Sequence, residues 1–447
     1  MKAFTASMLG LAALSGGITA GADYLELRRS AQLKETAESS AVVLDKLAPG
    51  TLLELTDDEQ QNGYYLARTR NGRAGFVYRT LVRRHRGSLP AEADPAGAPP
   101  GGDDEPAQPV SLSGPQMRAH LINVGQGAAT LFEFSCGVVL VDTGGETNGA
   151  FNSGAALSAY LDEFFDTRQD LERSIALLVL THPHIDHARN VKAIADEYTV
   201  QNVVTSGLTG SAPEKFFSGG RQQQWLERWA RQHARLETID AQSVPKGGLT
   251  SLTIDPLHCT DQDPEIRVLW GQVKERPDDW TAAAFANANN HSVVVRIDFG
   301  QSSFLVSGDL EEDAMPSLIA KHGGTRALDI DVWEVSHHGS KNGTGADALA
   351  ALTPAVALLA TGSPEREGTF TAWAFGHPRE TVIDDLLNAL PQDDPFRRTR
   401  RTRVPVASAV KDFESQRVNE AIYATGWDGS VVVTADTNGL YSVSTEL

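Results

Sequence analysis

A cluster of three histidines and one aspartate directly follows an apolar run, and it constrains the fold more than any other feature. The cluster reads His-x-His-x-Asp-His and occupies residues 182–187. The preceding residues 174–180 are apolar and of strand length, which predicts a buried strand. Polar side chains at a strand end are where α/β proteins commonly build their sites. The sequence therefore predicts an α/β domain with metal-competent side chains at the edge of a sheet.

The spacing of this cluster predicts two metal ions. His182 and His184 alternate along an extended segment, so both side chains can face one ion. Asp186 and His187 follow at a bend and can face a second ion. Imidazole and carboxylate ligands suit Zn²⁺ best, and Mn²⁺ is the alternative because a bridging carboxylate also suits harder ions.

Three downstream motifs can complete such a site. Asp309 stands in Ser-Gly-Asp-Leu after a strand-like run, where its carboxylate can bridge two ions about 3.5–4 Å apart. His337 and His338 end a second apolar run. One of them would complete the second metal site, and the other would touch substrate or support a ligand. His377 precedes a proline ahead of a helix and is a ligand, a substrate contact or a general acid.

The first 22 residues have the composition of a secretory signal peptide. Lys2 supplies a positive charge, and the apolar residues 4–18 are too short to span a bilayer comfortably. Ala20-Gly21-Ala22 offers a cleavage site. We therefore expect a periplasmic or secreted protein without stable membrane insertion, and a retained membrane anchor is the alternative.

Residues 23–86 predict a small all-β barrel, because short strand-like segments alternate with turn signals. Asn62-Gly63 and Asn71-Gly72 are strong hairpin signals. The unit resembles the bacterial SH3-like domain, whose members often end in a strand like Gly75-Phe76-Val77. That resemblance implies a cell-wall or other envelope ligand, and a purely packing role is the alternative. Residues 87–115, rich in Pro, Gly and Ala, predict a disordered linker.

Residues 116–447 mix strands with amphipathic helices and predict one large domain. Helices are expected over 154–165, 191–198 and 216–233, and a strand pair over 292–297 and 303–306. Cys136 and Cys259 can either form a disulfide in an oxidising compartment or remain two buried thiols.

The charge of the chain disfavours nucleic acid and anionic lipid as general partners. The formal net charge is −19, which repels both unless basic residues are segregated. The run from Arg397 to Arg403 is such a segregation. It could hold a phosphate-rich substrate, or it could be a solvated face.

The order of these motifs resembles the metallo-β-lactamase fold superfamily and, within it, the ComEC-type competence branch. The resemblance covers about residues 118–435. It implies an αβ/βα sandwich with metals at one edge and hydrolysis by a metal-activated water. The matching segments, in chain order, are 123–127, 141–145, 182–187, 307–310, 336–341, 376–378 and 423–430, of which the last corresponds to a closing strand hairpin.

The resemblance also implies a role for each candidate residue. His182 and His184 bind the first metal, Asp186 and His187 the second, Asp309 bridges, and His337 is the expected last ligand ahead of His338. Asp142 would brace the site by hydrogen bonds. A third histidine usually completes the first metal site, and His258 and His291 are the candidates. The expected catalytic residues are Asp186, His338 and His377. The branch often carries an acidic residue where this chain has Ala128, so metal affinity or substrate contacts are expected to differ from those of the branch.

The leading functional hypothesis is a secreted metal-dependent hydrolase that cleaves a phosphodiester, either as a phosphodiesterase or as a nuclease-like enzyme. Nucleic acid would then be a partner only as substrate. One alternative is hydrolysis of a lactam or lactone carbonyl. Another is a non-catalytic cell-envelope binding protein with a degenerate metal domain.

Overall fold

The protein divides into two compact units, Met1–Gly101 and Gly102–Leu447, which are described separately. The computed structural model describes residues 23–27, 31–37, 41–47, 50–57, 61, 64–85, 89, 112–208, 219–390, 397–398 and 400–447. The predicted signal peptide, residues 1–22, and most of the predicted linker lie outside these ranges.

The first unit is an all-β domain, as the sequence predicts. Its strands form one antiparallel sheet in the order β3-β2-β6-β5-β4-β1-β7. Leu25, Leu33, Leu53 and Val77 fill its core. Asn71-Gly72 makes the turn between β5 and β6, where Gly72 has a φ of 87°. Asn62-Gly63 lies outside the described residues, and the SH3-like resemblance stays a prediction. The strands are β1 Tyr24–Leu27, β2 Ala31–Lys34, β3 Val43–Leu47, β4 Leu52–Leu55, β5 Tyr64–Thr69, β6 Ala74–Tyr78 and β7 Val82–His85.

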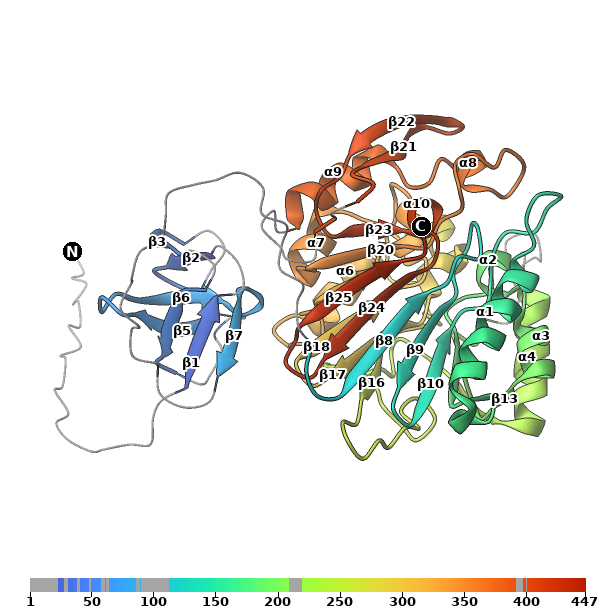
Figure 1. Ribbon diagram of the computed structural model, residues 1–447, viewed down its shortest axis with the longest axis horizontal. Coiled ribbons are helices and arrows are strands. Elements are labelled where there is room, and N and C mark those ends of the chain that lie inside the picture. Colours follow the sequence, from blue (N-terminus) through green and yellow to red (C-terminus); the bar gives the residue numbers. More distant parts are fainter. Residues whose placement is uncertain are drawn as a thin grey trace. The chain divides into compact units, whose positions relative to one another are not determined.

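The second unit is a four-layer sandwich in which two sheets face each other and helices cover their outer faces (Figure 1). The first sheet has the order β15-β14-β12-β10-β9-β8-β24-β25. Its strands are β8 Gln116–Leu121, β9 Thr130–Phe134, β10 Gly137–Val141, β12 Leu177–Leu180, β14 Asn202–Thr205, β15 Arg235–Thr238, β24 Val431–Asp436 and β25 Tyr441–Thr445.

The second sheet has the order β16-β17-β18-β19-β20-β23. Its strands are β16 Glu265–Trp270, β17 Val294–Phe299, β18 Ser302–Val306, β19 Val332–Glu334, β20 Val356–Leu359 and β23 Ile422–Ala424. Two small pairs stand apart: β11 Ser174–Ile175 with β13 Thr199–Val200, and β21 Arg403–Ala409 with β22 Asp412–Arg417.

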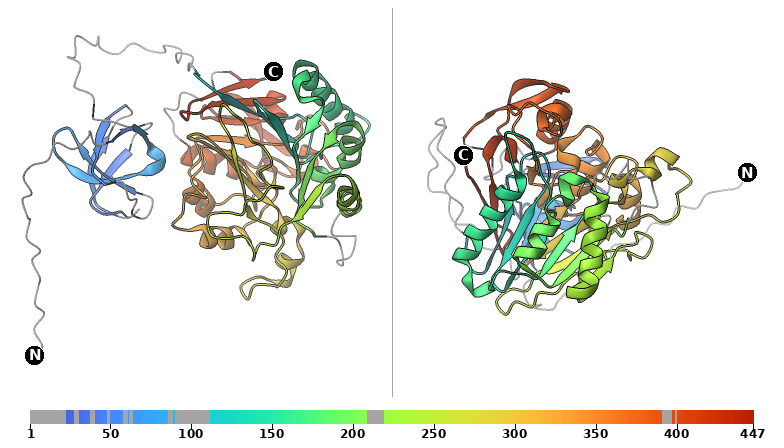
Figure 2. Two further views of the ribbon diagram at one scale, coloured as in Figure 1. Left: turned by 90° about the horizontal axis from the view of Figure 1, so that it is seen from below. Right: turned by 90° about the vertical axis from the view of Figure 1, so that its right-hand side faces the viewer.

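Helices close both outer faces of the sandwich, and Figure 2 shows them from two further sides. The first sheet is covered by α1 Ser153–Thr167, α3 Val191–Glu197 and α4 Gly220–His233, drawn in green. The second sheet is covered by α6 Met315–His322, α7 Ala346–Leu352 and α9 Glu380–Ala389. The short helices are α2 Ile185–Ala188, α5 Ala282–Ala286, α8 Ala372–Phe375 and α10 Thr425–Asp428.

Alternation along the strands explains this layering. In β10, Val139 and Val141 belong to the core between the sheets, whereas Val138 and Leu140 pack under the helices. Side chains in a strand point to opposite faces in turn, so an all-apolar strand is stable only when both faces are covered. The α/β sandwich predicted from the sequence is therefore confirmed.

Cys136 and Cys259 form a disulfide with a Cα–Cα distance of 5.3 Å, which resolves the alternative that the sequence left open. Cys136 lies in the turn between β9 and β10 of the first sheet, and Cys259 lies in the loop before β16 of the second. The bond therefore joins the two halves of the sandwich across 123 residues of sequence.

One sequence-based expectation near the C-terminus is wrong, and another loses one of its residues. Residues 423–430 do not form a strand hairpin: β23 pairs with β20 in the second sheet, and β24 pairs with β8 in the first. The segment instead carries the chain from one sheet to the other. Arg398 is not available to a substrate, because it is 4% exposed and its guanidinium pairs with Asp428 at 2.7 Å.

Among the described residues, no helix combines the length and apolar character needed to cross a membrane.

Candidate metal centre

The predicted site residues come together because several strands end at the same edge of the sandwich. β10 runs parallel to β12, and β18 runs parallel to β19. Parallel neighbours end on the same side of a sheet, so the residues that follow them share one edge. Asp142 follows β10, the histidine cluster follows β12, Asp309 follows β18, and His338 follows β19.

One group of possible metal ligands consists of His182, His184 and Asp309. The Nε2 atom of His182 lies 3.1 Å from Nδ1 of His184 and 3.6 Å from Oδ2 of Asp309. His182 is fully buried and Asp309 is 2% exposed. This group contains both residues that the sequence predicts for a first metal.

A second group consists of Asp186, His187, Asp309 and His338. The Nε2 atom of His187 lies 3.0 Å from Oδ1 of Asp309 and 3.2 Å from Nε2 of His338. The same His338 nitrogen lies 3.5 Å from an oxygen of Asp186. Ligands at zinc-like bond lengths of about 2.0–2.2 Å in a tetrahedral arrangement stand about 3.3–3.5 Å apart. The observed separations are close to that spacing.

Hydrogen bonds behind three of the histidines aim their Nε2 atoms at these groups. Nδ1 of His187 lies 2.7 Å from Oδ2 of Asp142, and Nδ1 of His338 donates to the carbonyl oxygen of Ala360 at 2.7 Å. Nδ1 of His182 lies 3.1 Å from the hydroxyl of Thr181. A metal-binding imidazole usually carries such a partner on its other nitrogen, which fixes the tautomer and the ring.

Glycines let the loops of the site approach each other. A Cβ atom added to Gly144 would lie 1.5 Å from the carbonyl oxygen of Asp186. The neighbouring residue Thr143 donates its backbone N–H to His187, and Ala128 donates to Asp186. The Asp-Thr-Gly-Gly motif therefore holds the histidine cluster through its backbone, and a side chain at position 144 would prevent this contact.

The electrostatics suit a bound cation. Burial lowers the pKa of His182 well below its usual value, and His187 acts in the same direction, so His182 is held neutral. Burial alone would raise the pKa of Asp309. Instead, His187 and His338 hold that pKa well below its usual value, so Asp309 is ionised. Neutral imidazole and ionised carboxylate are the forms that bind metals.

A metal ion fits this site because, among the described residues, no Lys or Arg pairs with its carboxylates. Oδ1 of Asp309 is buried, and no hydrogen bond satisfies it although His187 lies near. Across the described ranges, no Lys or Arg forms an ion pair with Asp186 or Asp309. Burial opposes protonation of His187, yet Asp309 and Asp142 raise its pKa well above the usual value. The carboxylates that attract this proton would attract a divalent cation in the same way.

His337, the last ligand expected from the sequence, lies beside the second group and not in it. Its Nε2 atom is 3.8 Å from Asp309, and its Nδ1 atom is 3.3 Å from Glu311. His337 and His338 have φ values of 52° and 55°, so the chain turns sharply between them. The turn sends His338 into the ligand group, and the distances favour His338 over His337. The ligand roles themselves stay predictions.

The candidates for a third histidine at the first group lie elsewhere. His258 is exposed and faces Asp263 at 3.7 Å. Both ring nitrogens of His291 are engaged: Nε2 lies 2.8 Å from the carbonyl oxygen of Phe285, and Nδ1 accepts from the backbone of Val273. Neither histidine belongs to a ligand group among the described residues.

His377 lies at the rim of the centre, where a contact with Gln126 orients it. Its Nδ1 atom is 3.2 Å from Nε2 of Gln126, and its ring stacks on that of His338 at 6.2 Å between centroids. The backbone N–H of Gln126 donates to the carboxylate of Glu146 at 3.2 Å, and Glu146 also faces Arg366 at 3.3 Å. Sequence reasoning gave no role to Glu146 and Arg366. Gln126 was visible only as a member of the Asn-Val-Gly-Gln-Gly motif.

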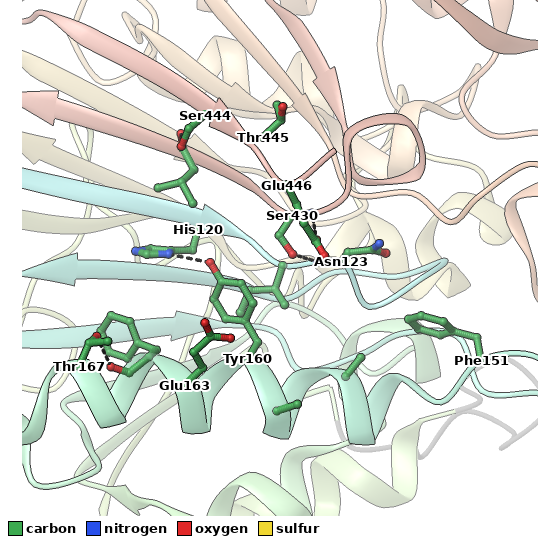
Figure 3. A pocket seen from close by; sticks show the side chains of 15 residues that line it. His120, Asn123, Phe151, Tyr160, Glu163, Thr167, Ser430, Ser444, Thr445 and Glu446 are labelled. Carbon is green, nitrogen blue, oxygen red and sulfur yellow. Dashed lines mark hydrogen bonds between the residues drawn. The ribbon is translucent and has the colours of Figure 1, made fainter. Parts of the chain in front are cut away.

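A separate pocket of about 680 Å³ opens between α1 and the strands β8, β24 and β25 (Figure 3). His120 and Tyr160 meet on its wall, with 2.9 Å between Nδ1 and the phenol oxygen. Behind them lies Glu133, which accepts from Arg118 at 3.0 Å and from Arg168 at 2.7 Å. These arginines neutralise Glu133 internally.

A comparison with protein families matches residues 122–362, more than half of the chain, to the metallo-beta-lactamase superfamily. That range contains both ligand groups.

Two curated relatives align with most of the large unit. ComE operon protein 3 of Bacillus subtilis is 26% identical over 278 residues, which cover 60% of this chain and 30% of that protein. Recombination protein 2 of Haemophilus influenzae is 26% identical over 268 residues, covering 60% of this chain and 26% of that protein. The chain therefore spans less than a third of the length of either relative.

Solved structures with a local likeness include the Rm3 metallo-beta-lactamase and the short form of human tRNase Z. The lactamase is 10% identical with a TM-score of 0.28, and the alignment covers 48% of this chain and 77% of the lactamase chain. The tRNase Z is 11% identical with a TM-score of 0.26, and the alignment covers 54% of this chain and 91% of the tRNase Z chain.

Proposed function

The chain belongs to the metallo-beta-lactamase superfamily, and on that premise we propose that it is a dinuclear metal-dependent hydrolase that cleaves a phosphodiester. The observation that carries this proposal is Asp309, whose two oxygens face two different groups of ligands. A carboxylate shared in this way is the arrangement by which two-metal hydrolases hold their ions about 3.5–4 Å apart.

A phosphodiester is favoured over a carbonyl substrate by the relatives. Two curated proteins that align with this chain are named for a competence operon and for recombination. A pair of cations clamps the attacking and leaving oxygens of an in-line displacement at phosphorus. Zn²⁺ is the expected ion because imidazole nitrogen dominates the ligand set, and Mn²⁺ is the alternative.

The residues of the chain would share the work as follows. Divalent ions bound at the two ligand groups would supply a water of lowered pKa and positive charge for the phosphoryl oxygens. His182, His184, His187, His338 and the carboxylates would hold those ions. Asp186 gives one oxygen to its group, and its second oxygen can accept a hydrogen bond from the attacking water.

His377 would act on the leaving group. Gln126 lies 3.2 Å from its Nδ1 atom, so Nε2 is the nitrogen that can meet a substrate. A donor at that place stabilises the charge that develops on a departing oxygen. His337 lies 5.8 Å from His377 between ring centroids and bounds the same side of the site.

Purified protein loaded with Zn²⁺ or Mn²⁺ tests the proposal on bis-p-nitrophenyl phosphate, single-stranded DNA and nitrocefin. We expect release of p-nitrophenol, abolished by a chelator and restored by metal. Hydrolysis of nitrocefin alone would show a carbonyl hydrolase. Metal binding without turnover of any of the three substrates would favour the non-catalytic alternative.

The disulfide supports a periplasmic or secreted location. Disulfides persist in oxidising compartments and are rare where thiols are kept reduced. Cys136 and Cys259 are bonded. Alkylation of whole cells before lysis should leave both cysteines unlabelled. Labelling of both would place the protein in a reducing compartment.

For the first unit we propose an envelope ligand, such as a cell-wall peptide. Its stacked pair Tyr24–His85 is partly exposed and offers aromatic surface for such contacts. Full-length protein should sediment with purified peptidoglycan, and equal recovery with an inert polysaccharide would contradict this.

A further inference from the structure

A row of aromatic rings leads from the protein surface to the candidate metal centre. The ring of Phe375 stacks on His377 with 5.7 Å between centroids and 25° between planes. His377 in turn stacks on His338 at 6.2 Å and 26°. Phe370 contacts Phe375 edge-on at 6.1 Å. Phe375, His377 and His338 therefore form one stack of rings, and Phe370 packs edge-on against Phe375.

The outer rings are unusually exposed for phenylalanine. Phe370 is 59% exposed and Phe375 is 37% exposed, whereas Phe132, Phe134 and Phe299 are almost fully buried. Val410, in the turn between β21 and β22, is 50% exposed and lies beside Gly376. Exposed apolar side chains that gather in one place usually mark a binding surface, whereas scattered ones need no explanation.

The backbone holds Phe370 in a costly conformation. Its φ is 59°, in the left-handed region that bulky L-residues rarely adopt. The hydroxyl of Thr371 donates to the carbonyl oxygen of Gly368 and caps α8 by accepting from Ala374, which fixes the turn. A Gly or Asn would relieve the strain. Strain retained at a surface ring indicates that the ring itself has a use.

The charges around the row favour a planar, uncharged occupant. Glu365 and Glu367 are exposed in the same loop as Phe370, so this loop does not form a phosphate clamp. Two nearby arginines already have partners within the protein: Arg379 donates to the carbonyl oxygen of Phe375, and Arg366 pairs with Glu146. The surface thus offers exposed rings beside two exposed carboxylates, which suits stacking of an uncharged group rather than ion pairing with a phosphate.

We infer that Phe370 and Phe375 form a stacking platform for a nucleobase attached to the scissile phosphodiester. This inference rests on the proposed function, because a phosphodiester held at the metal centre carries a substituent on each side of the phosphorus. A base on one of them would reach the platform while the phosphate meets His377. Aromatic rings stack any base, so the platform selects single-stranded nucleic acid over base-free phosphodiesters without reading sequence.

Two probes of equal charge test the platform. One is a fluorescently labelled oligothymidylate, and the other is an oligomer of the same length in which tetrahydrofuran residues replace the nucleosides. Binding to full-length metal-free protein is measured by anisotropy, and cleavage by the metal-loaded protein is measured on both. We expect wild type to prefer the base-carrying probe about tenfold, since one stacked base is worth about that factor or more.

The variants are Phe370→Leu, Phe375→Leu and Phe375→Trp. Each leucine should reduce the preference for the base-carrying probe severalfold, and tryptophan should keep it, because an indole also stacks. Leu252→Ala is the matched control, since Leu252 is 68% exposed in a loop outside the row. Unchanged thermal unfolding of each variant separates a lost platform from a lost fold.

Three results would overturn the inference: equal affinity of wild type for the two probes, equal loss on both probes in the leucine variants, or the same loss in Leu252→Ala. The last two outcomes would point to a protein or lipid surface as the occupant. A separate measurement tests the proposed function: if metal-loaded wild type does not hydrolyse bis-p-nitrophenyl phosphate, that function is wrong. The binding ratio remains decisive in that case, because it needs no turnover.

Discussion

The large unit contains two buried clusters of histidine and carboxylate that differ in one respect. Around Glu133, the guanidinium groups of Arg118 and Arg168 lie at 3.0 and 2.7 Å, and His120 completes the cluster. Around Asp309, the neighbours are imidazoles and further carboxylates. A buried carboxylate needs a counter-charge. Arg118 and Arg168 supply that counter-charge to Glu133. The counter-charge of Asp309 must come from protonated histidines or from an ion taken up from solution.

This difference separates a structural cluster from a candidate reactive one. Burial alone would raise the pKa of Glu133, but hydrogen bonds with His120, Arg118 and Arg168 lower that pKa to about 2, so the carboxylate is ionised without an ion from solution. At the other cluster, Asp309 keeps a buried oxygen without a hydrogen bond. A buried oxygen without a hydrogen bond destabilises the folded protein, and a bound cation would remove that destabilisation.

The largest expected difference between the clusters concerns activity. Asp309→Asn should lower phosphodiester hydrolysis at least about a hundredfold, because it removes the negative charge shared by both ligand groups. Metal analysis of the purified variant should show fewer than two ions per chain.

Glu133→Gln is the matched control for that substitution, and it should retain both ions and most activity. Two bound ions surviving in Asp309→Asn would remove the bridging role.

A smaller loss is expected from the residue behind the ligands. Asp142→Asn keeps a hydrogen bond to His187 but loses the charge that orients and polarises that imidazole. Metal affinity should fall about 10–100-fold, the usual cost of such a change. Competition with a chromogenic chelator measures it. An affinity equal to that of wild type would mean that His187 is not a ligand.

Bound metal should stabilise the folded protein through the Asp309 cluster and not through the Glu133 cluster. With free Zn²⁺ a hundredfold above its dissociation constant, the folded state gains about 2.7 kcal/mol. Thermal unfolding with and without chelator should show this gain in wild type and in Glu133→Gln. An equal gain in Asp309→Asn would locate the stabilising ion elsewhere.

The smallest expected effect is on the stability contributed by the Glu133 cluster, and it depends on pH. The pKa of Glu133 is lowered to about 2, so its ion pairs stabilise the fold fully above the unfolded value of about 4.3. That stabilisation falls as pH drops from about 4.3 through about 2. After allowance for solvent screening, Glu133→Gln should cost about 1–2 kcal/mol at pH 7.

Chemical denaturation of metal-free protein across pH checks this sign. The cost of Glu133→Gln should shrink as pH falls below about 4.3 and approach zero near pH about 2. A cost that grows on acidification would mean that the arginines do not carry the stabilisation.

Some features of the molecule follow from local sequence alone. The apolar runs before His182, Asp309 and His337 predict strands because their side chains can be stable only between covered faces. The helix expected over residues 154–165 appears as α1, Ser153–Thr167, because its apolar spacing fits one helical face. A metal centre at strand ends is predicted from the same reasoning, since ligand types and spacing are local properties.

Other features depend on residues far apart in the chain. Whether His337 or His338 enters the ligand group is decided by a sharp turn whose φ values no local pattern specifies. The partner of Cys136 is set by the packing of two sheets, because the cysteines are 123 residues apart. Arg398, one of an exposed-looking run, becomes a buried partner of Asp428.

The amino-acid sequence by itself determined the α/β class, the set of metal-competent side chains and the strands that carry them, because periodicity and residue chemistry are local. Only the tertiary structure decided which histidine nitrogens converge, which carboxylate acquires internal counter-charges, and that two exposed phenylalanines continue the row of His377 and His338. These outcomes depend on how the strand ends and the loops that follow them pack in space, and no spacing along the chain encodes that.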